Sequence, residues 1–532
     1  MRTLWSSLKR SRPSLFNAAS MSRKKLFVNG NVNDKNKMDI KKKSDISSGK
    51  SYVERKYVTS ITTNSAVILR EPPKPKGFPL FGTIFEFLNT GGAKMLHEYV
   101  DRRHKELGPI YRERIGPVMV VFVNSPQEYR RIFRLEGPTP KHFLPEAWLI
   151  YNELRSLERG LLFMNGEEWL KYRRILNKVM LLSDPTDMFV GPCQKAAEGL
   201  VEKWITQHNS DDTLSQLETQ LYQWSIEAML ATLMGSTWHQ HKSVISRYSE
   251  NLAKSLHKIF EYTAELSVLP AKLAKTLRLP SWNKFVESAD SALSIVRTLV
   301  PEMVHLGGDG LLQTMMNEGI RDDDLVRIVT DFIIAAGDTT AFSTQWMLFL
   351  LGNDTKLQDK LYESIQNLSS KEILRNSLIK GVIKETLRLY PIAPFITRYL
   401  PEDNVIGGYF VPKGELILLS LYSSSRDPIN FPRPNEFYPE RWIRTENGNY
   451  QDVVNPHANI PFALGARSCV GRKLAEIQIS LVLAELVRTF KIKCMNKDEV
   501  KLILHLISVP SKPIKLKLIK RNFTIQKNFL RA

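Results

Sequence analysis

The segment PFALGARSCVG, residues 461–471, decides the fold of this 532-residue chain. It follows the spacing F-x-x-G-x-R-x-C-x-G, whose fixed positions are Phe462, Gly465, Arg467, Cys469 and Gly471. The chain contains only three cysteines, so a chance match at all five positions is rarer than roughly one in ten thousand. Glycines let backbone N–H groups approach closely, and such donors hold the charge of a thiolate. The segment therefore predicts a glycine-rich loop in which backbone N–H groups can approach the sulfur of Cys469.

A helical pattern, GRKLAEIQISLVLAEL (471–486), follows the loop and would place the positive end of its dipole near the sulfur. Loop and helix together resemble the haem-binding segment of the cytochrome P450 superfamily, the haem proteins with a cysteine thiolate ligand. The resemblance implies haem b (iron protoporphyrin IX) as cofactor, bound through Phe462, Arg467 and Cys469, with Cys469 as the iron ligand. Taken singly, Cys469 would instead be a buried structural cysteine.

Helical periodicity dominates the chain after residue 91, with apolar residues spaced at three and four. The clearest helical segments are 96–107, 167–181, 217–234 and 378–390. Strand-like runs are few, and they lie at 118–123, 407–412 and 416–422. Because no repeat or Gly/Ser linker interrupts the body, we expect one monooxygenase domain over residues 51–532. The expected fold class is mainly α with a small β region: a cytochrome P450 fold, a single large haem-containing domain with a long central helix.

The central helix is predicted from Asp322 to Leu351, with its three leading aspartates as N-cap and first turn. AAGDTT (335–340) interrupts its apolar middle; by itself, this pattern equally fits a close helix crossing. It resembles the family's oxygen-activation motif, which implies that Asp338 and Thr339 are the catalytic acid–alcohol pair that supplies protons. One departure is that Ala336 stands where the family usually has glycine, and glycine follows one place later.

Three further motifs agree with the family's order. Glu385 and Arg388 lie one helical turn apart, and the resemblance implies that Arg441 of FYPERW (437–442) joins them in a buried structural ion-pair network. Trp169 and Arg173, also one turn apart, resemble haem-propionate contacts. Arg398 resembles the family's other propionate-binding arginine, since a guanidinium suits a carboxylate through paired hydrogen bonds. His457 is a weaker candidate for the same role.

The net charge of +20 sits mostly at the two ends of the chain. Residues 1–50 carry +10 and residues 512–532 carry +7, which leaves +3 for the 461 residues between them. A nucleic-acid partner is therefore not expected. Residues 1–50 are rich in Arg, Lys and Ser, without an acid before Asp34, which is typical of a mitochondrial transit peptide followed by a basic linker. A disordered basic tail is the alternative. We expect a mitochondrial protein on the matrix side of the inner membrane.

The electron donor is inferred from a small basic cluster. No stretch of about 20 apolar residues is present, so a membrane-spanning anchor is not expected, although peripheral association with the inner membrane is possible. Lys380 and Lys384 lie one turn apart, and Arg472 and Lys473 follow the haem loop. These positions resemble the docking residues of mitochondrial members, which implies an acidic adrenodoxin-like ferredoxin and its reductase as partners. A solvated basic face is the alternative.

The segments 91–116, 151–177, 220–230, 334–349 and 387–401 resemble the insect ecdysteroid 2-hydroxylases, and the likeness extends over about residues 70–510. It implies a reaction with O₂ in which carbon 2 of 2-deoxyecdysone, a steroid substrate, is hydroxylated to give ecdysone. Phe395, Ile396, Phe342 and Ile334 are candidates either for the substrate cavity or for the core. Three alternatives stay open: a mitochondrial hydroxylase of another steroid, sterol or xenobiotic; a haem isomerase that needs neither O₂ nor reductant; and a non-catalytic steroid- or haem-binding protein.

Overall fold

The structure, a computed structural model, describes residues 70–182, 184, 186–207, 213–267 and 270–521. The predicted transit peptide and linker (1–50) lie outside the described residues, as does the last part of the basic C-terminal tail (522–532). The boundary predicted at residue 51 therefore stays a prediction.

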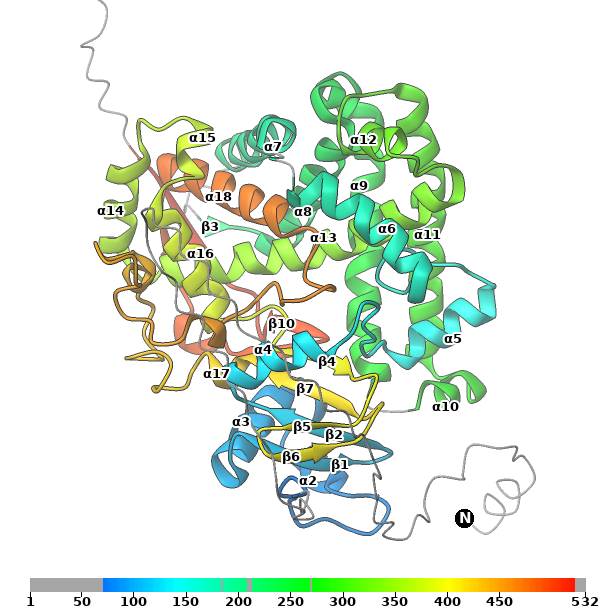
Figure 1. The fold of residues 1–532 in the computed structure, drawn as a ribbon. Helices are drawn as coiled ribbons and strands as arrows, with labels where there is room; N and C mark the ends of the chain where they lie inside the picture. The colour runs from blue at the N-terminus through cyan, green and yellow to red at the C-terminus, as the bar shows by residue number, and fades with distance from the viewer. Residues whose placement is uncertain (1–69, 183, 185, 208–212, 268–269, 522–532) are drawn as a thin grey trace, which may run out of the picture. The chain divides into compact units, whose positions relative to one another are not determined.

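Helices form most of the described chain (Figure 1). In chain order they are α2 (Ile84–Asn89), α3 (Leu96–Leu107), α4 (Pro126–Leu135), α5 (Glu146–Arg155), α6 (Gly166–Asn177), α7 (Thr186–Thr206), α8 (Leu217–Met234), α9 (Trp238–Leu266), α10 (Ala271–Thr276), α11 (Pro280–Leu306), α12 (Leu311–Asn317), α13 (Asp322–Leu351), α14 (Thr355–Ile365), α15 (Ser370–Ile373), α16 (Ser377–Leu389), α17 (Leu421–Ser424) and α18 (Arg472–Thr489).

The strands form small sheets, and the largest lies at the bottom of Figure 1. Its order is β1-β2-β7-β4, in which β2 and β7 run parallel and the other neighbours run antiparallel. The remaining sheets are β3-β11-β8, β9-β10 and β5-β6. The strands are β1 (Ile110–Ile115), β2 (Val118–Val123), β3 (Thr213–Leu214), β4 (Phe395–Tyr399), β5 (Asn404–Ile406), β6 (Tyr409–Val411), β7 (Leu416–Ser420), β8 (Phe490–Cys494), β9 (Leu502–His505), β10 (Ile507–Pro510) and β11 (Leu516–Lys520).

The expected helices and strands are largely confirmed, because their apolar periodicity matches the faces that are buried. The helix predicted over 167–181 ends as α6 at Asn177 and continues as a wider π-helical turn, Lys178–Leu182. The run 416–422 leaves the sheet after Ser420 and turns into α17. Periodicity missed several strands. In β1, for example, buried Arg112 and Glu113 hide the apolar pattern, since each is held by polar partners.

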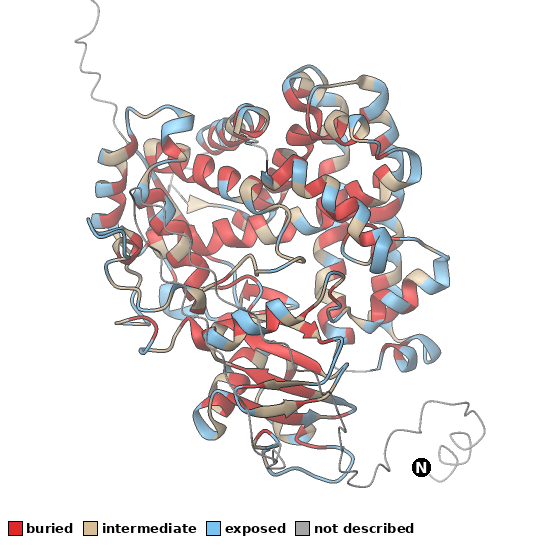
Figure 2. Cartoon of the chain, in the orientation of Figure 1, coloured by how far each residue is buried: buried red, intermediate tan, exposed pale blue. Residues whose placement is uncertain are grey.

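The central helix is confirmed as α13, but its predicted N-cap is wrong. The capping position is Arg321, which makes no side-chain capping bond, and the three aspartates all lie in the first turn. There they face the exposed N–H groups and the positive end of the helix dipole. Figure 2 shows α13 buried along most of its length beneath the surrounding helices. No helix in the described part of the chain has the length and apolarity needed to cross a bilayer.

Candidate haem site

The loop around Cys469 closes on itself directly before α18. The Cys469 amide donates to the Phe462 carbonyl at 2.8 Å, so the two ends of the motif meet. Gly465 has a positive φ of 77°, and an added Cβ would lie 2.1 Å from Glu136 Oε1, so only glycine fits there. α18 begins three residues after Cys469, as the sequence predicts.

The surroundings of the Cys469 thiol act on its pKa in opposite directions. Burial raises the pKa of the thiol, while the backbone N–H of Gly471 and the positive charges of Arg173 and Arg472 lower it. Cys469 nevertheless keeps accessible surface, and so does Ala335 in the middle of α13, whose neighbours Ile334 and Gly337 are buried. Accessible surface at the centre of a buried helix indicates an internal hollow.

Three arginines predicted to bind the haem gather at this loop: Arg173 and Arg398, predicted as propionate contacts, and Arg467 of the loop itself. Burial, with the positive charges of Arg398 and Arg173, lowers the pKa of Arg467 to about 10. Arg173 Nη2 donates to the Ser468 carbonyl at 2.6 Å. Buried Arg173 Nε and Arg398 Nη2 make no hydrogen bond within the described structure. Trp169 is buried, and the guanidinium carbon of Arg467 lies 4.3 Å from its ring centroid.

Two members of this cluster were missed by sequence reasoning. Buried Glu136 accepts from Arg398 Nε at 2.5 Å and from the Ala466 amide at 2.7 Å, so it ties β4 to the haem loop. Burial, together with Arg467 and Arg398, lowers the pKa of His142 to about 3. Neither ring nitrogen of His142 makes a hydrogen bond within the described structure. No motif spacing connects these residues to the loop, so the sequence carries no signal for them.

His457 is the weaker candidate for a propionate contact. It belongs to the short turn Pro456–Ala458, and its charged neighbour is Arg130. The histidine on which Arg467 and Arg398 act is His142, and the role proposed for His457 stays a prediction.

The two residues of the predicted acid–alcohol pair face different surroundings on α13. Thr339 is half-buried, and its hydroxyl donates to the Ala335 carbonyl at 2.7 Å. Asp338 is completely buried, and burial raises the pKa of its carboxyl well above its ordinary value. Neither carboxylate oxygen makes a hydrogen bond within the described structure. Burial thus favours the protonated form of Asp338, one residue from a hydroxyl that lies near accessible surface.

The displaced glycine of AAGDTT has a structural reason. A Cβ at Gly337 would lie 3.2 Å from the ring of Tyr222 on α8, which is tighter than a normal contact. Ser225, also on α8, donates its hydroxyl to the Gly337 carbonyl at 2.7 Å. Glycine at 337 therefore lets α8 approach α13 closely, and the sequence alone did not indicate the partner.

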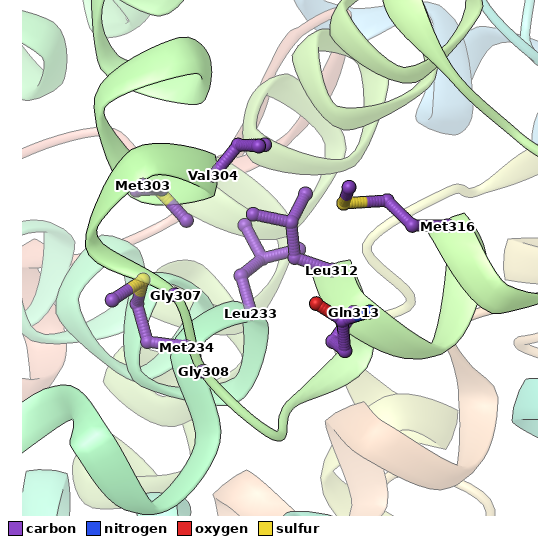
Figure 3. Close-up of a pocket in the computed structure, with 9 residues that line it drawn as sticks. All are labelled: Leu233, Met234, Met303, Val304, Gly307, Gly308, Leu312, Gln313 and Met316. Carbon is purple, nitrogen blue, oxygen red and sulfur yellow. The ribbon is translucent and has the colours of Figure 1, made fainter.

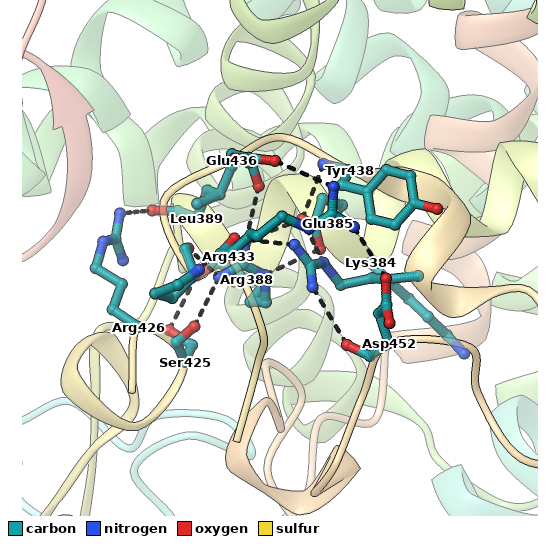
Figure 4. Close-up of polar contacts among 12 residues, drawn as sticks. Lys384, Glu385, Arg388, Leu389, Ser425, Arg426, Arg433, Glu436, Tyr438 and Asp452 are labelled. Carbon is teal, nitrogen blue, oxygen red and sulfur yellow. Dashed lines mark hydrogen bonds and ion pairs between the residues drawn. The ribbon is translucent and has the colours of Figure 1, made fainter. Parts of the chain in front are cut away.

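The ion-pair network is assembled as expected, and it is larger than predicted (Figure 4). Arg388 binds both oxygens of Glu385 at 2.9 Å, and Arg441 Nε donates to Glu385 Oε1 at 2.9 Å; all three side chains are fully buried. Trp442 Nε1 and the Tyr438 amide also donate to Glu385, at 2.9 and 3.1 Å. Five donors to one carboxylate offset the desolvation that a buried charge requires.

The four cations predicted for docking lie around one carboxylate. Burial raises the pKa of Glu476, on the first turns of α18, against the positive charges of Arg472, Lys384, Lys380 and Lys473. Lys380 and Arg472 are exposed. Lys384 is half-buried, because its ammonium donates to the Tyr450 hydroxyl at 2.9 Å and packs over the rings of Tyr450 and Trp442. We define these four cations as the basic cluster.

One further pocket and the four apolar residues considered for a substrate cavity remain to be placed. The pocket in Figure 3, between α8, α11 and α12, holds about 10 Å³, which is room for a single water molecule. Of the residues considered for a substrate cavity, Ile334, Phe342 and Ile396 are buried in the core, and Phe395 is half-buried. The structure therefore favours the core reading for the first three.

The arrangement fits a haem. A buried cluster of arginines with unpaired guanidinium nitrogens matches a group with two carboxylates. A desolvated cysteine beside a backbone donor and two arginines matches a metal that takes a thiolate. The accessible surface at Ala335 and Thr339 leaves space beside the middle of α13 for such a group.

Comparisons with known proteins agree with this geometry. The cytochrome P450 family model matches residues 72–518. Cytochrome P450 315a1, mitochondrial, of Drosophila melanogaster is 37% identical, covering 84% of this chain and 88% of the relative. The mitochondrial cholesterol side-chain cleavage enzyme of Oncorhynchus mykiss is 29% identical, covering 82% and 87%. A retinoic acid-bound cyanobacterial CYP120A1 structure has a TM-score of 0.70 at 21% identity, covering 85% of this chain and all of the other.

A thiolate loop, a long central helix and a buried arginine cluster on this fold define a haem-thiolate monooxygenase. The chain belongs to the cytochrome P450 family, and its cofactor is haem. Among its relatives are several named as mitochondrial P450s.

Proposed function

We propose that this protein is a mitochondrial ecdysteroid hydroxylase that converts 2-deoxyecdysone to ecdysone, a step of moulting-hormone biosynthesis, with electrons from a ferredoxin. The observation that carries the proposal is the resemblance of five long segments to the insect 2-hydroxylase called Shadow. These segments are 91–116, 151–177, 220–230, 334–349 and 387–401. The 37% identity to a mitochondrial insect P450 supports it.

Each site residue is proposed to do one part of the work. Cys469 holds the iron, and the Gly471 N–H with Arg173 and Arg472 favours its thiolate form. Arg173, Arg398 and Arg467 bind the two propionates, which relieves their mutual repulsion. When bound, haem supplies the reductive activation of O₂, by which one oxygen atom enters a C–H bond and the other leaves as water.

Protons for this reaction come from α13. Burial raises the pKa of the Asp338 carboxyl, which favours its protonated form, and the Thr339 hydroxyl can pass a proton onward because it both donates and accepts. Asp338 is thus proposed as the proton source and Thr339 as the last donor. This pair argues against the haem isomerase alternative, because an isomerase takes up no protons and would not need Asp338 and Thr339.

The basic cluster is proposed as the docking site of an acidic ferredoxin. Its exposed members Lys380 and Arg472 flank the start of α18, close behind the thiolate loop. Opposite charges steer a partner to such a surface. A mitochondrial location supplies that partner, and the transit peptide proposed for residues 1–50 would direct the chain there.

Peripheral contact with the matrix side of the inner membrane is proposed for the segment before and along α2. Phe78, Leu80, Phe81, Phe85 and Leu88 all expose apolar side chains there, with Leu80 85% exposed. An apolar patch of this kind marks an interaction surface more often than ordinary solvent contact.

The deciding experiment is reconstitution of the haem-loaded protein with a mitochondrial ferredoxin, its reductase and 2-deoxyecdysone. We expect ecdysone as product. Cholesterol is the comparison substrate, because relatives include enzymes named for cholesterol side-chain cleavage. Product from cholesterol alone would replace the ecdysteroid proposal with a sterol one.

A second measurement tests the thiolate separately. The reduced, CO-bound protein is expected to show the red-shifted absorption band of a thiolate-ligated haem, and the Cys469→His variant should bind haem without that band. A wild-type spectrum without the band would overturn the proposed role of Cys469. The variants Cys193→Ser and Cys494→Ser should leave the band unchanged, since both cysteines belong to the core.

A further inference from the structure

Asp338 faces a second buried polar group across the α8–α13 interface. Tyr222 on α8 is 3% exposed, and its hydroxyl, like both carboxylate oxygens of Asp338, makes no hydrogen bond of standard geometry within the described structure. The hydroxyl is nevertheless near enough to lower the pKa of Asp338, against the larger effect of burial. Leaving such a group unpaired in a core is costly, because the group gives up its hydrogen bonds with water. A phenylalanine would fill the same space without that cost.

The backbone of α13 is shaped to admit this tyrosine. The Tyr222 hydroxyl would lie 3.3 Å from a Cβ at Gly337, so the glycine before Asp338 makes room for it. Ser225, three residues further along α8, donates to the Gly337 carbonyl at 2.7 Å and fixes the two helices in register at this point.

A polar line continues from Tyr222 to the surface. Glu218 lies one turn earlier on α8, and its Oε1 is 3.6 Å from Nδ1 of His257 on α9. The side chains of His257 and Glu218 are 42% and 36% exposed. The rings of Tyr222 and His257 meet edge to face, with centroids 6.2 Å apart. The charge of Glu218 raises the pKa of both Tyr222 and Asp338, so the Glu218 carboxylate is electrostatically coupled to both buried groups.

We propose that Tyr222 relays protons from the half-exposed Glu218–His257 pair to Asp338, and so reloads the acid after each turnover. The relay deepens the proposed function, because it rests on Asp338 as the proton source. The phenol gives its proton to a carboxylate oxygen of Asp338 and takes one from His257 through a bridging water. His257 then recovers a proton from solvent, so every relay group returns to its starting state. Tyr222 is a positioning residue that acts through Asp338.

The test compares Tyr222→Phe and Glu218→Gln in the full-length, haem-loaded protein. The infrared carbonyl band of Asp338, identified by its absence in Asp338→Asn, is titrated without turnover. Its midpoint should move to higher pH in Tyr222→Phe, which loses the donor that lowers the pKa. It should move to lower pH in Glu218→Gln, which loses the charge that raises it. Opposite shifts are not expected of two merely destabilising substitutions.

Turnover gives the second readout. With substrate, ferredoxin and reductase, Tyr222→Phe should lower kcat about tenfold at unchanged KM, because reprotonation slows while binding does not. The solvent deuterium isotope effect and the share of oxygen released as hydrogen peroxide should both increase. Tyr248→Phe is the control, since that hydroxyl binds Glu302 at the α9–α11 interface.

The outcomes separate the relay from the function on which it rests. Unchanged midpoints with unchanged kcat in both Tyr222→Phe and Glu218→Gln would overturn the relay. If Asp338→Asn itself leaves kcat and peroxide release unchanged, the proposed role of Asp338 fails as well. If Tyr222→Phe does not fold, Glu218→Gln and His257→Gln still test the relay. Both side chains are half-exposed, so neither substitution disturbs the core.

Discussion

Buried charge sets the behaviour of individual residues in this site. Arg173, Arg398 and Arg467 lie together with Glu136 and His142, and burial together with the positive charges of Arg398 and Arg173 lowers the pKa of Arg467. Asp338 shows the opposite case, a single carboxyl whose pKa is raised by burial. In both cases water is replaced by a fixed arrangement of protein groups, which is what an electrostatic site requires.

Glu136→Gln tests whether this carboxylate organises the arginine cluster. The variant leaves Arg398 without its ion-pair partner and weakens the bond to the Ala466 amide. We expect haem to dissociate about tenfold faster, as for losses of residues that orient a metal ligand. Stability of the protein should fall by about 3 kcal/mol, because one member of a buried pair is removed.

Haem transfer to apomyoglobin and urea unfolding are the measurements for Glu136. Glu106→Gln is the matched control, because Glu106 pairs with Arg103 from a half-exposed position. That change should alter stability by less than about 0.5 kcal/mol. Equal behaviour of the two variants would contradict the role given to Glu136.

Asp338→Asn tests the protonation of the central acid through stability. The folded-state pKa of Asp338 is raised, so the folded protein holds a proton that the unfolded chain releases above about pH 4. The stabilisation is complete below that pH and is lost as pH rises toward the folded pKa, at up to about 1.4 kcal/mol per pH unit. The measurement is urea unfolding of wild type and variant at several pH values between the unfolded-state and folded-state pKa of Asp338. The free energy of unfolding should lose this pH-dependent contribution in Asp338→Asn and keep it in the wild type. Parallel pH profiles would show that Asp338 is ionised in the fold.

Close approach between helices is the main feature at the scale of elements. α8 packs on the middle of α13 because Gly337 offers no side chain and Ser225 bonds its carbonyl. α16 carries Glu385, and three donors from Tyr438, Arg441 and Trp442 fasten the segment around Pro439–Trp442 against it. Gly381 on the same helix admits the Pro439 carbonyl, which an added Cβ would meet at 2.6 Å.

Gly337→Ala tests the α8–α13 contact. The new methyl group would meet Tyr222 at 3.2 Å, so we expect a loss of about 1–3 kcal/mol from overpacking. Gly191→Ala on α7 is the control, because nothing lies within 4 Å of its added Cβ. The control should gain about 0.5–1 kcal/mol, since alanine favours a helix over glycine. Thermal unfolding of both variants measures the difference, and a stabilised Gly337→Ala would contradict the packing argument.

Charge distribution is the feature that acts across the whole molecule. The +20 of the chain lies mostly in its two ends, and the body between residues 51 and 511 carries only +3. On that nearly neutral body the basic cluster is a local feature beside the thiolate loop. A partner guided by charge would therefore be directed to one region of the surface.

Lys380→Glu/Arg472→Glu tests the docking proposal. Reversing two exposed charges should raise the KM for an acidic ferredoxin about tenfold at low salt, with kcat at saturating ferredoxin unchanged. The difference should shrink as salt rises, because exposed charges are screened. Lys413→Glu/Lys497→Glu makes the same charge change at exposed lysines outside the cluster and should leave KM unchanged. A similar KM in both double variants would disprove the docking site.

The amino-acid sequence by itself determined the thiolate loop, the central helix and the pairs Glu385–Arg388 and Trp169–Arg173. Their residues are close along the chain, and local spacing on a loop or a helix is enough to place them. The family assignment and the main helices followed from the same signals. Strand β1 did not, because ion pairing buries charged residues where an apolar pattern would be expected.

Only the tertiary structure decided which distant residues complete the site. Glu136 reaches Arg398 and Ala466 across more than 260 residues, and Tyr222 meets Asp338 from a separate helix. Such contacts depend on how α4, β4, α8 and α13 pack, and no short-range pattern encodes that packing. The physical reason is the low dielectric of the core. A buried polar group needs its partner wherever the chain brings one, so the partner is specified by the fold rather than by spacing.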